Sequence, residues 1–338
     1  MRAARKGEKP LVSVIMFVYN HAPYLKQAIE SVLMQEGSFP AEILIHDDAS
    51  SDGSAEIIRT YAKRFPDLIV PLLESENQTR QGINYVDHTI MPRLSGTYIA
   101  HCEGDDYWTD PKKLKKQVRI LEKHPEYAAV THNCTVVDAH GRRKKPVGKF
   151  YPFRRTCVYT LRELSFEARM PGQTATVVYR SSIQKDMPAS EKEHYQAIRS
   201  LLGDRRRTLL ILLNGPVLCL NRSMSAYRLV IDSGQSWNAR AKGKNLAGAL
   251  FMQEWDFRKF AADSYGIHLE NDFALFGTGL MSLIRAAARP SEANLKQKEL
   301  AVSAAGGERE LLKCLLESFF PALLVLMKRP VQELRWRL

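Results

Sequence analysis

The sequence predicts an α/β protein with a mostly parallel sheet flanked by helices and a helical C-terminal extension. Over residues 11–137, short apolar runs alternate with amphipathic segments, polar clusters follow several of those runs, and the chain beyond Ser233 is mostly helical in pattern. Strands that alternate with helices are typical of a parallel sheet covered on both faces. Such sheets bind ligands beyond the carboxyl ends of their strands.

The first elements repeat the order strand, loop, helix. The run LVSVIMFV predicts a strand at Leu11–Val18, and YLKQAIESVLMQ predicts an amphipathic helix after it. A second strand is predicted at Glu42–His46, followed by a helix that Asp52 or Ser54 can cap. A third strand is expected at Leu68–Leu73.

The following segments extend the sheet and then change character. INYVDHTIMPRL predicts a helix, TYIAHCE a strand, DPKKLKKQVRILEKH a helix and YAAVTHNCTVVD a strand. From Gly141 a basic segment broken by Pro and Gly predicts a loop or β-ribbon. We expect a strand at Gly172–Arg180, one helix broken at Gly203 or two helices, and a strand pair in PVLCLNRSMSAYRLV. One domain is therefore predicted at residues 1–235 and a helical extension at residues 236–338.

Composition favours a protein with an anionic partner. Lys and Arg number 49 against 37 Asp and Glu, for a net charge of +12, and residues 142–169 hold nine basic residues against two acidic ones. Phosphate, nucleic acid and anionic lipid all fit such a surface, and simple solubilisation is the plain alternative. Five scattered cysteines without a C-x-x-C pair indicate reduced thiols in a cytoplasmic protein. We expect neither a signal peptide nor a membrane-spanning segment.

Polar clusters follow three predicted strands: Tyr19-Asn20, Asp47-Asp48 and the segment from Glu103 to Asp106. In a parallel sheet these strand ends meet at one edge, so the clusters predict a binding site there. Three carboxylates within four residues repel one another unless a cation or solvent relieves them.

Three stretches together resemble the family-two glycosyltransferases, which have the nucleotide-sugar-binding GT-A fold. They are VSVIMFVYNHAPYLKQAIESVLMQ, ILIHDDASSDGS and YIAHCEGDDYW, and the last two are similar to the family's D-D-x-S-x-D-G and D-x-D-D patterns. The resemblance covers residues 11–135, continues less closely to about residue 235 and does not extend further. It implies that residues 1–235 form the catalytic domain.

The resemblance implies a metal site in EGDD. Asp105 matches the final Asp of the family's D-x-D and is expected to hold Mg²⁺ or Mn²⁺ against the donor's phosphates. Glu103 replaces the usual first Asp, which indicates a contact with ribose hydroxyls or with metal-bound water. Gly104 and Asp106 complete the predicted nucleotide-sugar site, where Asp106 orients its neighbours or approaches the sugar.

The resemblance also implies a nucleotide pocket. Asp47 is expected to accept the N3–H of uracil, with Asp48 beside it, and this favours a UDP-sugar donor. The opposite wall is assigned to Phe17, Val18, Tyr19 and Asn20, with Tyr19 stacking on the base. Arg80 or Gly82 stands where the family closes over the nucleotide, although an ordinary loop fits the sequence equally well.

The acceptor side depends on Gln173 and on a general base. By the resemblance, Gln173 touches the sugar and Asp204 is the general base, with helix capping as the plain alternative and with Glu191 and Glu193 as rivals. Arg228 of the Tyr-Arg pair is assigned to the phosphates. The metal-binding His that the family places soon afterwards is absent from AYRLVIDSGQSW.

The predicted function is inverting transfer of a sugar from a UDP-sugar to a hydroxyl of a glycan or lipid-linked acceptor in bacterial surface polysaccharide synthesis. A metal-dependent nucleotidyltransferase is the alternative, but it would normally have a glycine-rich loop, and FVYNHAP has no glycine. A nucleic-acid-binding protein is a third reading, disfavoured because the basic segments lack interleaved aromatics. The apolar segment Leu311–Met327, followed by cations, predicts peripheral attachment to the cytoplasmic face of the inner membrane, or else packing on the protein or a homodimer partner.

Overall fold

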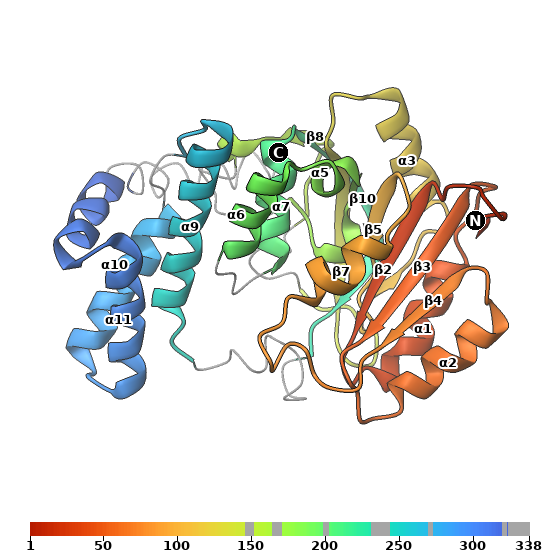
Figure 1. Cartoon of the computed structure of the whole chain (residues 1–338), viewed down its shortest axis with the longest axis horizontal. Helices are drawn as coiled ribbons and strands as arrows, with labels where there is room; N and C mark the ends of the chain where they lie inside the picture. The colour runs from red at the N-terminus through yellow and green to blue at the C-terminus, as the bar shows by residue number, and fades with distance from the viewer. Residues whose placement is uncertain are drawn as a thin grey trace. The chain divides into compact units, whose positions relative to one another are not determined.

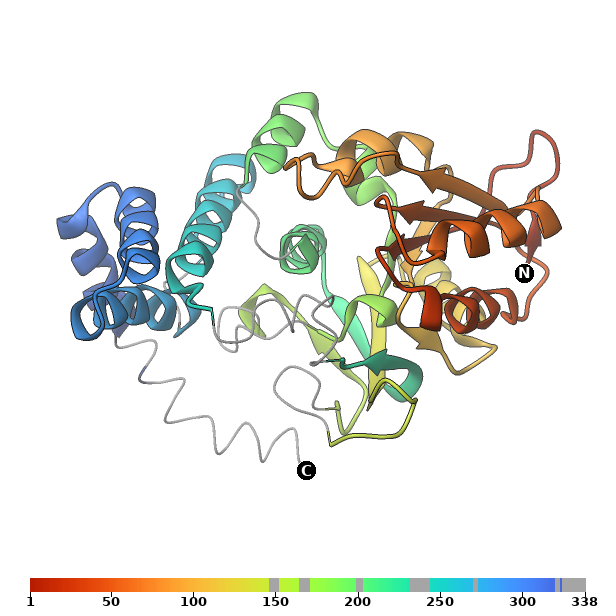
Figure 2. The same ribbon diagram turned by 90° about the horizontal axis from the view of Figure 1, so that it is seen from below.

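The computed structural model describes residues 1–145, 152–163, 171–198, 203–230, 244–269, 273–319 and 323. The chain divides into two compact units (Figures 1 and 2). The first unit comprises Met1–Val158, Pro171–Asp186 and Gly215–Val230. The second comprises Tyr159–Met170, Met187–Asn214 and Ile231–Leu338. Residues 187–214 thus cluster with the C-terminal helices, whereas the sequence analysis counted them with residues 1–235.

The first unit is built on a ten-stranded mixed sheet in the order β1-β3-β2-β5-β9-β7-β10-β6, in which β4 pairs with β3 and β8 pairs with β10. The strands are β1 (Arg2–Ala3), β2 (Val12–Val18), β3 (Pro40–Asp47), β4 (Ile69–Leu73), β5 (Tyr98–His101), β6 (Tyr107–Trp108), β7 (Ala129–Val137), β8 (Cys157–Tyr159), β9 (Val178–Arg180) and β10 (Val217–Arg228).

Most pairings are parallel, as predicted. β2 pairs in parallel with β3 and β5, β3 with β4, and β7 with β10. β9 is antiparallel to both β5 and β7, so β5 and β7 run in the same direction. The carboxyl ends of β2, β3, β5 and β7 therefore share one edge of the sheet, which is the edge that the sequence analysis assigned to the site.

One face of this sheet packs on three helices: α1 (Ala22–Leu33), α2 (Ser54–Arg64) and α3 (Lys113–Lys123). Alternate residues of β2, from Val12 to Val18, join the apolar faces of these helices in one core. Residues of the opposite face, such as Ile15, are buried as well. Burial on both faces explains why this strand is an unbroken apolar run in the sequence.

Several local expectations were wrong. PVLCLNRSMSAYRLV forms one long strand, β10, whose register shifts between Leu220 and Ser225 accommodate the polar residues that suggested a turn. INYVDHTIMPRL forms only a π-helical turn (Val86–Ile90) and a 3-10 turn (Met91–Arg93), because a proline inside the segment interrupts α-helical hydrogen bonding. The predicted strand at Gly172–Arg180 is reduced to β9, preceded by a 3-10 turn at Thr174–Thr176.

The first unit also contains the short helix α5 (Ser182–Lys185). The second unit is mainly helical. Its helices are α6 (Ala189–Ala197), α7 (Gly203–Leu213), α9 (Ala247–Tyr265), α10 (Phe273–Ala288) and α11 (Glu292–Ala305), and residues 308–319 are also helical. α9 and α11 approach closely at Gly248, where a Cβ would lie 1.7 Å from the carbonyl oxygen of Gln297. Within the described part of the chain, no helix has the length and apolarity needed to cross a bilayer.

Candidate functional site

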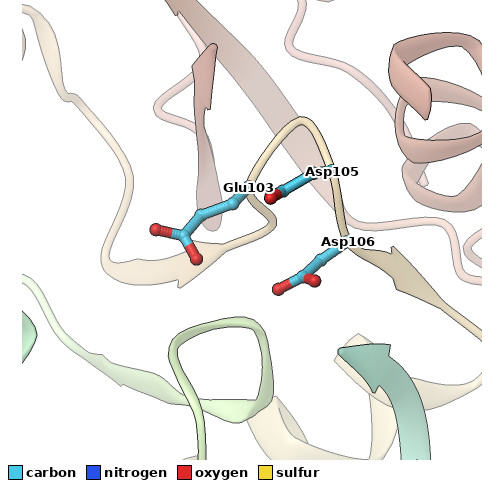
Figure 3. A group of neighbouring side chains, drawn as sticks. All are labelled: Glu103, Asp105 and Asp106. Atoms are coloured by element: carbon cyan, nitrogen blue, oxygen red, sulfur yellow. The ribbon is translucent and has the colours of Figure 1, made fainter. Parts of the chain in front are cut away.

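The loop between β5 and β6 brings the three predicted carboxylates together. Glu103, Asp105 and Asp106 each offer a carboxylate oxygen, and these oxygens all lie within 4.8 Å of one another (Figure 3). The loop follows the carboxyl end of β5 at the shared edge of the sheet. The amide of Asp106 donates to the carbonyl of Glu103 at 3.0 Å, which makes the loop a tight turn. The turn therefore concentrates negative charge at the predicted binding edge.

Asp106 is the buried member of this acidic cluster. Burial raises the pKa of its carboxyl well above the ordinary value, and the charges of Asp105 and Glu103 raise it further. The backbone N–H of Arg228 at 2.8 Å and the amide of Gln173 at 2.7 Å donate to its two oxygens and oppose that shift. Both oxygens of Asp106 are thus held by donors, while burial and the two acidic neighbours favour its protonated form.

The donor set fits a hard divalent cation. Carboxylate oxygens are the ligands that Mg²⁺ and Mn²⁺ prefer, and a bound cation would relieve the mutual repulsion of the three groups. Asp105 and Glu103 are both half-buried, whereas Asp106 is buried. The predicted metal ligand Asp105 thus lies in a suitable cluster.

Arg228, which is expected to contact the phosphates, holds the acidic loop in this structure. Its guanidinium donates to the carbonyl oxygens of Asp105 at 2.9 Å, Asp138 at 3.2 Å and Ala139 at 2.9 Å, and to the side chain of Gln27 at 2.7 Å. The side chain is buried. Through these hydrogen bonds Arg228 joins the acidic loop to the turn after β7, and its contact with the phosphates stays a prediction.

Gln173 lies in the site, beside the buried carboxylate of Asp106. It is buried, donates its amide to Asp106 and accepts the N–H of Ala175 at 2.8 Å. Gln173 therefore caps the 3-10 turn and orients the buried carboxylate. The expected direct contact with the sugar stays a prediction.

Gly104 is explained by a close approach between the acidic loop and the start of α1. A Cβ at this position would lie 2.8 Å from Nδ1 of His21 and 3.0 Å from the side chain of Val18. Any larger residue would push the loop away from the helix. The glycine thus allows the acidic cluster to sit directly beside His21, a residue that the sequence analysis did not select.

The DDASSDG motif forms hydrogen bonds within its own turn and with neighbouring loops. Both oxygens of Asp47 accept from Ser50, from its backbone N–H at 3.0 Å and from its hydroxyl. Asp48 accepts from the backbone N–H of Gln78 at 2.6 Å and from the hydroxyl of Thr79 at 2.6 Å. Both carboxylates are buried. The expected contact between Asp47 and a base edge stays a prediction, and Asp48 holds the loop that contains Arg80.

The same motif ties the two helix starts together. Asp52 accepts from the backbone N–H of Ala22 at 2.9 Å and from that of Ser54 at 3.0 Å. Asn20 adopts φ of 56°, a left-handed conformation that Asn tolerates, and its side chain accepts from the N–H of Ser51 at 2.9 Å. Asn20, expected in the nucleotide wall, thus shapes the loop between β2 and α1.

An aromatic group lines the same edge of the sheet. The rings of Phe17 and Tyr85 meet edge to face with their centroids 5.7 Å apart. The ring of Tyr85 stacks on that of His46, with centroids 4.3 Å apart. Burial, reinforced by the nearby charges of Asp48 and Glu103, raises the pKa of Tyr85 to about 12. Tyr85 was not predicted as a site residue, because INYVD has a helical pattern that gives no sign of a position in the site.

Tyr19 and Gly82 belong to the exposed rim of this edge. The hydroxyl of Tyr19 accepts from the guanidinium of Arg80 at 3.0 Å, which links the loop after β2 to the loop after β4. Gly82 has φ of 72°, so it turns the chain in a conformation that favours glycine. The predicted stacking of Tyr19 on a base and the closing role of Arg80 or Gly82 stay predictions.

Asp204 lies in the second unit, as the second residue of α7, where its side chain accepts from the backbone N–H of Arg205 at 2.8 Å. The guanidinium of Arg205 pairs with Glu254 on α9, with one contact of 2.8 Å. Burial alone would raise the pKa of Glu254, but Arg205 and Arg258 lower it below its ordinary value. Arg205 thus stabilises a buried ion pair between helices, and the assignment of Asp204 as base stays a prediction.

Comparisons with known proteins agree with this description. A model of the family described as "Glycosyl transferase family 2" matches residues 13–186. An uncharacterised protein of Mycobacterium tuberculosis (strain ATCC 25618 / H37Rv) is 34% identical over 247 residues, which cover 69% of this chain and 65% of that protein. The chain therefore spans about 65% of the length of this curated relative.

For a second relative and for a solved structure, the match with this chain covers more than 90% of the other protein. TuaG of Bacillus subtilis (strain 168), named as a teichuronic acid biosynthesis glycosyltransferase, is 26% identical over 265 residues, or 76% of this chain and 96% of TuaG. The structure of S. aureus TarS 1-349 in complex with UDP-GlcNAc has a TM-score of 0.62 and 15% identity, covering 95% of this chain and 92% of that one. This likeness confirms the predicted fold.

Proposed function

Because the chain belongs to glycosyl transferase family 2, we propose that it transfers a sugar from a UDP-sugar to a hydroxyl of a glycan or lipid-linked glycan. The observation that carries this proposal is the acidic cluster of Glu103, Asp105 and Asp106 at the carboxyl end of β5. Family membership also favours sugar transfer over the nucleotidyltransferase alternative.

The acidic cluster would hold Mg²⁺ or Mn²⁺, with Asp105 as the principal ligand. When bound, such a cation neutralises the negative charge that grows on the departing diphosphate. Asp106 stays fixed by Gln173 and the backbone of Arg228, so it presents one geometry to the site. Preorganisation of this kind avoids the cost of gathering three like charges during the reaction.

UDP is the proposed donor nucleotide because TarS, which shares the fold, was solved with UDP-GlcNAc. The proposed partner of the N3–H of uracil is Asp47, whose carboxylate also accepts from Ser50. Tyr19 and Phe17 supply aromatic surface at the expected position, next to the network that begins at Asp48. A base bound there would stack on a side chain and meet backbone groups of the adjacent loops.

The proposed reaction inverts the anomeric carbon. The acceptor oxygen forms a bond to that carbon as the bond to the UDP oxygen breaks, and a carboxylate takes the hydroxyl proton. Asp204 is the proposed base, with Glu191 and Glu193 on α6 as rivals. Asp204 is the second residue of α7.

The proposed acceptor belongs to bacterial surface polysaccharide synthesis, since TuaG is named for teichuronic acid biosynthesis. A place on the cytoplasmic face of the membrane is supported by an exposed apolar row on residues 308–319. Leu312, Leu316 and Phe319 are spaced by four and three residues, and Leu316 is 74% exposed. In the sequence, Lys328, Arg329, Arg335 and Arg337 follow, which suits anionic lipid heads, although these four lie outside the described residues.

The membrane proposal needs substitutions instead of a truncation. Leu311, Cys314 and Leu315 pack in the core of the second unit, so deleting the chain from Leu311 would unfold it. We expect Leu316→Asp to weaken sedimentation with vesicles of anionic phospholipid, whereas Leu295→Asp on α11 should not. If both variants and the wild type sediment equally, the row does not contact lipid. A concentration-dependent dimer lost in Leu316→Asp would favour a homodimer instead.

The transferase proposal is tested by UDP release from a panel of UDP-sugars, with and without Mn²⁺. We expect one UDP-sugar to be hydrolysed slowly and only with the cation, and transfer to be faster when a glycan acceptor is added. Pyrophosphate release from a nucleoside triphosphate and a sugar phosphate would instead support the nucleotidyltransferase. Salt-sensitive gel shifts with nucleic acid, without UDP release, would support the third alternative.

A further inference from the structure

His21 lies beside the acidic cluster although it comes from a different loop. It precedes α1, and its Nε2 is 3.8 Å from Oδ2 of Asp105. The two side chains are 20% and 22% exposed, so solvent reaches both of them. This proximity places a nitrogen donor next to the principal carboxylate of the proposed metal site.

The ring of His21 is held in place from two sides. The backbone N–H of His21 donates to the hydroxyl of Ser54 at 3.0 Å, which fixes the start of α1 against α2. On the other side, the absence of a Cβ at Gly104 lets the ring lie against the acidic loop. Nδ1 is buried there and has no hydrogen-bond partner among the residues that the structure describes. The orientation of the ring is therefore set by packing, and Nε2 is the nitrogen nearest the carboxylate.

The separation of Nε2 and Oδ2 suits two ligands of one ion better than a hydrogen bond. At 3.8 Å it exceeds normal hydrogen-bond lengths of roughly 2.7 to 3.2 Å. Two ligand atoms, each roughly 2.1 Å from one ion, lie about 3 to 4.2 Å apart, depending on the angle between them. The observed distance falls inside that span. Asp105 and His21 can thus contact one cation without rearrangement of the loop.

We propose that His21 supplies a nitrogen ligand to the cation held by Glu103, Asp105 and Asp106, and that it favours Mn²⁺ over Mg²⁺. This inference rests on the proposed metal-dependent transfer. The segment that follows Arg228 contributes no histidine before residue 268, so His21 fills a ligand position from the opposite side of the acidic loop. Imidazole nitrogen suits transition metals, whereas Mg²⁺ prefers oxygen, so one nitrogen shifts selectivity toward Mn²⁺.

The test measures cation binding to the full-length protein, independent of sugar transfer. Mn²⁺ binding is followed by the electron paramagnetic resonance signal of the free ion, and Mg²⁺ binding by its competition with Mn²⁺. We expect His21→Gln to weaken Mn²⁺ binding roughly 10-fold or more, the scale for disturbing a metal ligand shell, and to change Mg²⁺ binding little. His124→Gln, at an exposed histidine paired with Glu126, is the matched control.

A spectroscopic readout on the unmodified protein guards against a folding defect in the variant. Pulsed electron paramagnetic resonance of Mn²⁺ bound to the wild type should show magnetic coupling to an imidazole nitrogen. The same measurement on His21→Gln should show no such coupling. Absence of that coupling in the wild type, or an equal loss of Mn²⁺ and Mg²⁺ affinity in His21→Gln, overturns the inference while the metal site itself stands. If the wild type binds neither cation, the metal-dependent function fails and the inference fails with it.

Discussion

Lys113 is a buried cation whose removal should change how the stability of the protein depends on pH. It is the first residue of α3 and is fully buried, and its Nζ lies 4.2 Å from the centre of the Trp108 ring. The amine has no hydrogen-bond partner among the described residues. Burial lowers the pKa of Lys113 from 10.5 to about 7, with a small opposing effect from Cys102.

The sign of the effect follows from proton binding in the two states. Between pH 7 and 10.5 the unfolded chain keeps Lys113 protonated while the folded protein holds it neutral, so stability rises with pH. Each pH unit changes the free energy of unfolding by about 1.4 kcal/mol, which amounts to about 5 kcal/mol across the whole interval. Below pH 7 both states are protonated and this contribution is flat. The face of Trp108 favours the ammonium by roughly 1 to 2 kcal/mol and so offsets part of the cost.

The perturbation is Lys113→Met, which keeps the length and apolar stem and removes the amine. We expect the variant to be more stable than the wild type at pH 7, with the difference shrinking by about 1.4 kcal/mol per unit toward pH 9. Urea unfolding at pH 7, 8 and 9 measures this, and subtracting one protein from the other cancels the groups they share. Lys115→Met, at an exposed position of the same helix, is the control. A constant difference between Lys113→Met and the wild type at all three pH values would refute a neutral Lys113.

Three further substitutions test the proposed chemistry and the loop. Asp105→Asn should abolish transfer and cation-dependent UDP binding with the fold intact; unchanged UDP release with Mn²⁺ present would reject the metal site. Asp204→Asn should preserve UDP-sugar affinity and lower turnover roughly 10²-fold; if turnover falls instead in Glu191→Gln or Glu193→Gln, the base lies on α6. Gly104→Ala should lower the free energy of unfolding by roughly 1 to 3 kcal/mol, because its Cβ meets His21 at 2.8 Å; an unchanged melting temperature would contradict this.

The Asp204 test needs its own control because the residue opens a helix. Asp favours helix starts whether or not it is catalytic, so Asp204→Asn must melt near the wild-type temperature before lost turnover is assigned to chemistry. Asn is itself a good residue at helix starts, which makes it the right replacement. Asp204→Ala would confuse the two effects.

The strands and the acidic loop could be predicted from sequence because their causes are local. A β-branched run such as Val12–Val18 is readable without its partners, and so is the placement of Asp105 after a strand. The roles of Gln173 and Arg228 could not be predicted this way, since both depend on contacts with Asp106 that are 67 and 122 residues away in sequence. The family resemblance implies ligand contacts for both residues, and in the structure both donate hydrogen bonds to Asp106.

His21 and Lys113 were missed for a related reason. The sequence around His21 is fully explained as a loop before a helix. The sequence around Lys113 is fully explained as the basic start of a helix. Burial of the Lys113 amine and the approach of His21 to Gly104 arise only when the helices dock on the sheet. No periodicity in the sequence marks such contacts.

The contacts of Arg228 also have a consequence for the order in which the chain acquires its site. Gln27 and Arg228, which touch through one hydrogen bond, are separated by 201 residues. A chain emerging from the ribosome contains every carboxylate of the acidic loop long before it contains β10. Until that strand docks between β7 and β6, Asp106 lacks the N–H of Arg228, and the loop lacks its link to the turn after β7. Closing a loop of so many residues is slow. Nascent chains that end before β10 should therefore contain the carboxylates of the acidic loop without an assembled site.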